Sequence, residues 1–220
     1  LALFVATFAQ TASAQNRASI NLVLALDASA SVNGNEFALQ RAGIAFALRD
    51  PDVRAAIIAS PGGVNIAITQ WSSISQQAVA VDWTSLTDDM SIRKLAKTVV
   101  EMPRHLSGGN TMIHAGLEFA GKLHESAPVP ASRRVIDVSG NGHTDDLSLL
   151  VETRRDLIGD GIVINGLAIE EDPGNVTLHF AQYLIGGPGS FVMTATSWLD
   201  FARAMRLKLL RELEQKLVTR

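Results

Sequence analysis

The chain has 220 residues, of which 47% are hydrophobic and 19% charged, a size and composition that suit one globular domain with a full core. Its formal net charge of -3 and its isoelectric point near 5.9 argue against a general nucleic-acid-binding protein, which usually has a basic surface. The absence of cysteine excludes disulfides and thiolate metal sites.

The first 14 residues have the pattern of a secretory signal peptide. A short apolar run from Leu1 to Ala9 is followed by Ala12-Ser13-Ala14, a small-residue cleavage pattern. The run is too short to span a membrane, and no other stretch approaches the needed length. We therefore expect residues 15–220 to form one domain that is periplasmic or secreted; a buried N-terminal helix is the alternative.

The remaining sequence alternates between strand-like and helix-like segments. The expected strands are 19–26, 64–71, 77–83, 134–139, 162–169 and, as an edge strand, 191–194. The expected helices are 36–48 with a further turn over 53–59, 87–100, 111–124, 146–158, 175–184 and a last helix from 197 towards 217. This alternation predicts an α/β fold of three layers with a doubly wound, mostly parallel sheet. The short connection between 64–71 and 77–83 predicts a hairpin, and hence one antiparallel edge strand.

An oxygen-rich cluster follows the first expected strand. The apolar run Leu22 to Leu26 is typical of a strand buried on both faces, and Asp27, Ser29 and Ser31 come directly after it. Ligands bind at the carboxyl ends of strands in open α/β sheets, and hard divalent cations prefer oxygen ligands. The spacing therefore indicates a cation site, although Asp and Ser are also common turn and helix-capping residues.

Two later segments complete a pattern that resembles a known family. They are Gly108-Gly109-Asn110-Thr111 and Asn141-Gly142, each in a loop before an expected helix. In this order the three loops resemble those of von Willebrand factor A (VWA) domains, most closely the bacterial exported family DUF1194. The resemblance spans roughly Ser19 to Leu213.

The resemblance implies a Rossmann-like fold with a metal-ion-dependent adhesion site (MIDAS). Its ligands would be Asp27, Ser29, Ser31, Thr111 and Asn141, and its cofactor Mg²⁺ or Mn²⁺. In the family, an Asp or Glu of a protein partner completes the coordination of the ion. The implied function is an exported protein-binding module rather than an enzyme.

Asn141 departs from the family pattern, which has Asp at this position. Asn offers a carbonyl oxygen but no charge, so the ion would keep about one net positive charge beside Asp27. The change weakens intrinsic metal affinity and strengthens attraction for an acidic partner. Alternatively, Asn141 marks a VWA-like interaction domain that no longer uses metal. A third, less favoured hypothesis is a Mg²⁺-dependent enzyme acting on an anionic small molecule.

Three further acids and the last helix have simpler explanations. Asp137 lies inside the expected strand 134–139 and, if buried, needs a hydroxyl or a helix N-terminus as partner. Asp145 and Asp146 are expected to cap the helix that follows them. The last helix has one apolar stripe, with basic residues on its other faces: Phe201, Met205, Leu209, Leu213 and Leu217 against Arg203, Arg206, Lys208 and Arg211. It is expected to pack on the sheet; the alternative is an interfacial or partner-binding helix.

Overall fold

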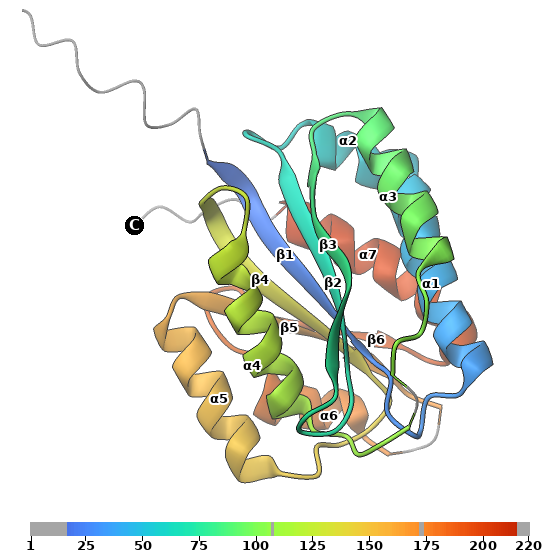
Figure 1. Cartoon of the computed structure of the whole chain (residues 1–220), viewed down its shortest axis with the longest axis vertical. Helices are drawn as coiled ribbons and strands as arrows, with labels where there is room; N and C mark the ends of the chain where they lie inside the picture. The colour runs from blue at the N-terminus through green and yellow to red at the C-terminus, as the bar shows by residue number, and fades with distance from the viewer. Residues whose placement is uncertain (1–16, 107, 172–173, 215–220) are drawn as a thin grey trace, which may run out of the picture.

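A six-stranded sheet forms the centre of the molecule (Figure 1). The computed structural model describes residues 17–106, 108–171 and 174–214, so the expected signal peptide lies outside the described residues. The strands are β1 (Ala18–Asp27), β2 (Val64–Trp71), β3 (Gln77–Leu86), β4 (Ala131–Gly140), β5 (Ile162–Ile169) and β6 (Val192–Ala195). Their spatial order is β3-β2-β1-β4-β5-β6, and only β3 runs antiparallel to its neighbour. The predicted doubly wound sheet with one antiparallel edge strand is confirmed.

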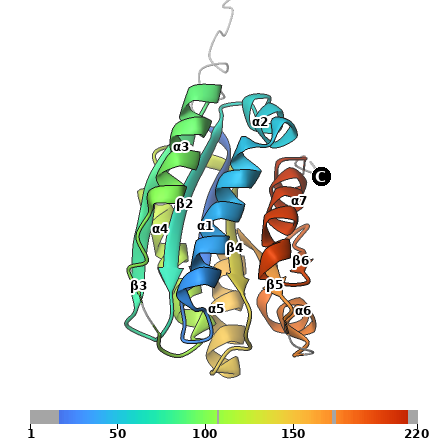
Figure 2. The same cartoon turned by 90° about the vertical axis from the view of Figure 1, so that its right-hand side faces the viewer.

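Helices cover both faces of the sheet. They are α1 (Gly34–Arg49), α2 (Pro51–Ile58), α3 (Asp89–Glu101), α4 (Ile113–Leu123), η2 (His124–Ser126), α5 (Leu147–Gly159), α6 (Val176–His179), η3 (Phe180–Leu184), η4 (Trp198–Asp200) and α7 (Phe201–Glu214). Helices α1, α2, α3 and α7 share one core with the sheet, and α4, α5 and α6 share the other. Figure 2 shows α1, α2 and α7 in front of the sheet, with α4 and α5 behind it. None of the described helices has the length and apolar character needed to cross a membrane.

Strand β1 is buried on both faces, as its continuous apolar run predicted. Alternate residues Leu22, Leu24 and Leu26 enter the α1 and α7 core, whereas Val23 and Ala25 enter the α4 and α5 core. This burial fixes the register of β1 between β2 and β4, because a slip of one residue would exchange the two faces. Asp27 is thereby held at the carboxyl end of the central strand.

Local capping explains where the helices differ from expectation. Asn33 and Glu36 form a reciprocal capping box, so α1 begins two residues before the predicted helix. Asp50 caps a separate helix, α2, whose first residue is Pro51, where a fixed φ suits a helix start. Segment 175–184 is a short α-helix followed by a π-helical turn, rather than one regular helix.

The last helix packs as expected against α1 and the sheet, but its inner face is not purely apolar. Lys208 was expected on an outer face; it is instead fully buried, and its Nζ lies 2.8 Å from Asp137 Oδ1. Asp137 thus pairs with a lysine and not with the expected hydroxyl or helix N-terminus. One turn later, the buried Glu212 carboxylate accepts hydrogen bonds from Arg133 on β4 and Asn165 on β5. Leu217 lies outside the described residues.

Candidate metal-binding site

Three loops meet at the carboxyl edge of the sheet, in the lower part of Figure 1. They connect β1 to α1, α3 to α4 and β4 to α5. Because β1 and β4 are adjacent and parallel, their carboxyl ends place the first and third loops side by side. The sheet thus brings together residues that are more than 100 positions apart.

The first loop holds its acid away from solvent. Asp27 is fully buried; its Oδ1 accepts a hydrogen bond from the Ser29 backbone N–H at 2.8 Å, and its buried Oδ2 has no hydrogen-bond partner among the described residues. Burial raises the pKa of Asp27 to about 6, and the hydrogen bonds of Ser29 oppose that rise. A buried carboxylate with one free oxygen favours a neighbouring cation.

The three polar side chains beside Asp27 form a hydrogen-bonded chain. The Ser29 and Ser31 hydroxyl oxygens are 3.1 Å apart, and the Ser31 hydroxyl donates to Asn141 Oδ1 at 2.8 Å. Asn141 Nδ2 donates in return to the Ser31 carbonyl at 3.3 Å. Ser31 is exposed, so this series of hydrogen bonds extends from the region of the buried acid to the surface.

Thr111 is joined to the third loop through its backbone. Its N–H donates to Asp145 Oδ2 at 2.8 Å, and its carbonyl accepts from the Asp145 N–H at 3.1 Å. Its side chain faces the third loop, because a Cβ built on Gly142 would lie 3.7 Å from Thr111 Oγ1. Asp145 therefore joins the second and third loops. The expectation that it helps to cap α5 is wrong, since Asp146 alone caps that helix.

Glycine permits the close approach of the second loop. Gly109 has φ of 99°, and a Cβ there would lie 2.5 Å from the Ser72 hydroxyl oxygen. Its carbonyl accepts a hydrogen bond from the Ala30 N–H at 3.0 Å, which ties the second loop to the first. The buried Ser72 hydroxyl donates to the Gly108 carbonyl at 2.5 Å. Hydrogen bonds within the protein therefore link all three loops to one another without an ion.

The donor set suits a hard divalent cation. It consists of one carboxylate, three hydroxyls and one amide carbonyl, all oxygen. Within the described residues, no group of three or more His, Cys, Asp or Glu side chains could hold a metal. Among the five predicted ligands Asp27 is the single acid, so an ion held by them would otherwise depend on neutral oxygens.

Some residues that shape the site carried no sequence signal. Gln40 of α1 donates to the Asp27 carbonyl at 3.0 Å and accepts from the Ser139 hydroxyl. Gly140 ends β4, where a Cβ would lie 3.0 Å from Asp27 Oδ2. Arg104, in the loop after α3, donates to carbonyls of the first loop. These contacts join distant segments, so no local motif marks them.

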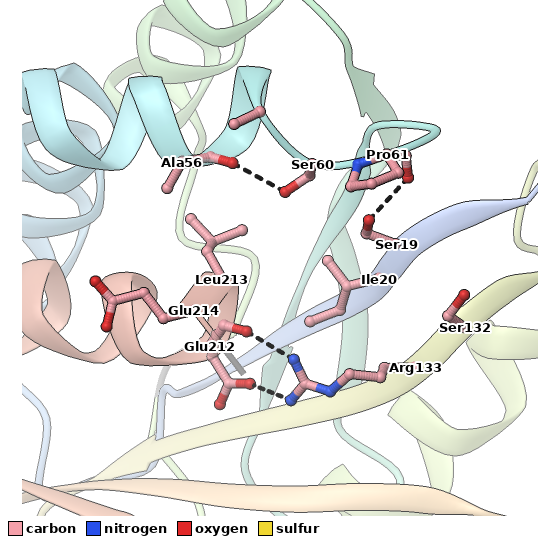
Figure 3. A pocket seen from close by; sticks show the side chains of 11 residues that line it. Ser19, Ile20, Ala56, Ser60, Pro61, Ser132, Arg133, Glu212, Leu213 and Glu214 are labelled. Carbon is pink, nitrogen blue, oxygen red and sulfur yellow. Dashed lines mark hydrogen bonds and ion pairs between the residues drawn. The ribbon is translucent and has the colours of Figure 1, made fainter. Parts of the chain in front are cut away.

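A hollow of about 650 Å³ lies at the opposite edge of the sheet. It is bordered by the starts of β1 and β4 and the ends of α2 and α7, and Figure 3 shows Arg133 directed at Glu212 along one side. Its lining is largely apolar, with Ile20, Ala56 and Leu213 among the contributors. None of the predicted site residues lines it, so it is separate from the loop cluster.

The family model described as "Protein of unknown function (DUF1194)" matches residues 17–217. No curated protein sequence matches the chain.

Solved structures with the same fold are distant in sequence. Proximal thread matrix protein 1 from the mussel byssus has a TM-score of 0.66 at 14% identity, covering 90% of this chain and 48% of that one. The pilus adhesin SpaC from Lactobacillus rhamnosus GG has a TM-score of 0.66 at 12% identity, covering 91% and 31%. The vWF domain of the type V pili tip protein Mfa5 from Porphyromonas gingivalis has a TM-score of 0.59 at 12% identity, covering 92% and 99%.

These likenesses establish the fold as that of VWA domains. The mussel protein is also described with a zinc-occupied MIDAS motif, with a TM-score of 0.64 at 15% identity over 90% of this chain and 46% of that one. This chain covers about half or less of the length of each of the first four structures that match it.

Proposed function

The chain belongs to the DUF1194 family, and we propose that it is an exported binding module that docks an acidic group of a protein partner through a divalent cation. The observation that carries this proposal is the buried Asp27 Oδ2, which has no hydrogen-bond partner among the described residues and lies in a cluster of neutral oxygens. Asp27, Ser29, Ser31, Thr111 and Asn141 would hold Mg²⁺ or Mn²⁺. The bound cation would supply a positive centre for a carboxylate.

Formal charge favours an acidic partner. Asp27 neutralises one of the two positive charges of the ion, and Asn141 neutralises none. An ion held in this way attracts one more carboxylate, and the exposed Ser31 leaves a side of the cluster open to solvent. An Asp or Glu side chain of a protein partner provides the missing charge.

Fold relatives support a role in protein interaction. SpaC is a pilus adhesin, Mfa5 is a pili tip protein, and the mussel protein carries zinc in its MIDAS motif. Identities of 12–15% transfer the fold alone, so the ion and the partner belong to the proposal. The signal-like pattern of residues 1–14 supports a periplasmic or secreted location.

One contact favours a second candidate, a VWA-like interaction domain without metal. Asn141 Oδ1 already accepts a hydrogen bond from Ser31, and an amide pairs with a hydroxyl without any ion. In that case, partner binding would be insensitive to chelators.

A Mn²⁺ titration followed by electron paramagnetic resonance, without and with glutarate as the carboxylate probe, tests the proposal. We expect one Mn²⁺ site, its loss in Asp27→Ala, and tighter Mn²⁺ binding when glutarate is present, because linked ligands raise each other's affinity equally. The absence of a saturable site would favour the metal-free domain. A site that does not respond to glutarate would contradict docking of an acidic group.

A further inference from the structure

We infer that Arg104 is a positioning residue that holds the first loop in the shape needed to bind the cation, an inference that rests on the proposed metal site. Arg104 Nη2 donates to the Ala28 carbonyl at 3.0 Å, the Val32 carbonyl at 2.7 Å and, more weakly, the Ser29 carbonyl at 3.4 Å. Its Nε donates to the Leu106 carbonyl at 2.7 Å. One guanidinium therefore spans the backbone that carries Ser29 and Ser31.

Arg104 is itself held in place by β2. The buried Gln70 side chain donates to the Pro103 carbonyl at 2.8 Å and accepts from the His105 N–H at 2.8 Å. The residues on both sides of Arg104 are thus fixed to the sheet. The guanidinium also lies 5.5 Å from the centroid of the Phe37 ring, on the first turn of α1.

This geometry links the first and second loops of the site through one side chain. The rigid sheet holds Gln70, Gln70 holds the backbone around Arg104, and Arg104 holds residues 28–32. A planar fork with fixed donor directions suits several carbonyl acceptors at once, whereas an ammonium group does not impose the same geometry. Groups that orient metal ligands without touching the metal commonly change metal affinity 10–100-fold when they are removed.

An electrostatic role and a positioning role of Arg104 predict opposite changes in Mn²⁺ affinity when the residue is replaced. Arg104 is a cation beside a cation site, so loss of its charge alone would strengthen Mn²⁺ binding. Loss of its carbonyl contacts would instead free the first loop, and ordering that loop would then oppose binding. The direction of the change in affinity therefore separates the two roles.

The test compares Mn²⁺ affinity by calorimetry in the wild type, Arg104→Met and Arg104→Lys. We expect Mn²⁺ binding to weaken about tenfold or more in Arg104→Met and several-fold in Arg104→Lys, which keeps the charge but loses the fork. Arg41→Met is the matched control, since Arg41 also donates to carbonyls, those of Val100 and Met102, and also lies near Phe37, yet no hydrogen bond of it reaches the first loop. Arg104→Met with unchanged or stronger Mn²⁺ binding would overturn the inference.

Hydrogen exchange without metal separates this inference from the proposed function. In Arg104→Met, the amides of residues 28–32 should exchange faster than in the wild type, while the amides of β1 exchange at the same rate. This expectation does not depend on whether the wild type binds Mn²⁺. A wild type that binds no Mn²⁺ would refute the metal site but not the contact between Arg104 and the first loop. Unchanged exchange in residues 28–32 would refute the positioning role.

Discussion

At the scale of single residues, the candidate site depends on one acid among neutral oxygens. The spacing of Asp27, Ser29 and Ser31 after an apolar run was enough to place them together at a strand end. The contact of Ser31 with Asn141 could not be predicted from spacing, because it spans 110 positions and depends on the pairing of β1 with β4. That these residues bind a metal stays a prediction.

Asn141→Asp should tighten Mn²⁺ binding about tenfold, a gain of about 1.4 kcal/mol, because it adds a second carboxylate to the cluster. Calorimetric titration measures the change. Asn33→Asp is the control, since it adds the same charge near the same loops and keeps an acceptor at the start of α1.

Equal affinities for Asn141→Asp and Asn33→Asp would show that only the net charge of the loop edge matters. Weaker binding in Asn141→Asp would show that this side chain does not face the ion.

At the scale of elements, bounds were predictable where the pattern is local. β2 and β5 have the predicted bounds: β2 alternates apolar residues, β5 is mostly apolar, and each begins directly after a glycine. The inner face of α7 was only partly predictable. Its apolar stripe marked the packed side, but the burial of Lys208 depends on Asp137, 71 positions earlier, which only the folded sheet brings into contact.

Lys208→Met should lower the free energy of unfolding by about 3–5 kcal/mol, because it leaves Asp137 as a buried, unpaired acid. Urea unfolding measures the loss. The double variant Asp137→Leu/Lys208→Met should recover most of it, since it removes both members of this ion pair and leaves the buried Glu212 paired with Arg133. A double variant less stable than Lys208→Met would contradict this explanation of the pair.

At the scale of the whole molecule, the two edges of the sheet differ. The carboxyl edge carries the three linked loops, and the other edge carries the hollow beside Arg133 and Glu212. The alternation of segments predicted a parallel sheet, and in such a sheet the loops that follow the strands lie together at the carboxyl edge. The hollow was not predictable, because it depends on how the ends of α2 and α7 lie against β1 and β4.

Several buried groups make the stability of the fold depend on pH, and His124 in η2 is one of them; the raised pKa of Asp27 acts in the opposite direction. Burial, together with the positive charge of Arg134, lowers the pKa of His124 from 6.5 to about 4. The unfolded chain therefore binds this proton first, and the stability present above pH 6.5 falls as the pH drops towards 4. The loss amounts to about 3 kcal/mol.

His124→Phe should make the slope of the unfolding free energy against pH less positive between pH 4 and pH 6.5, while it keeps an aromatic ring beside Trp83. Urea unfolding at several pH values measures the slope. An unchanged slope in His124→Phe would show that His124 does not contribute to the pH dependence.

A calorimetric titration of Mn²⁺ into the wild type and Asp27→Asn decides whether Asp27 is the centre of a cation site. The substitution keeps the shape of the side chain and removes its charge. Loss of Mn²⁺ binding by a folded variant is therefore due to the missing charge and not to unfolding. We predict one Mn²⁺ site per chain in the wild type and none in Asp27→Asn. Equal Mn²⁺ binding by both proteins, or binding by neither, would contradict a cation site built on Asp27.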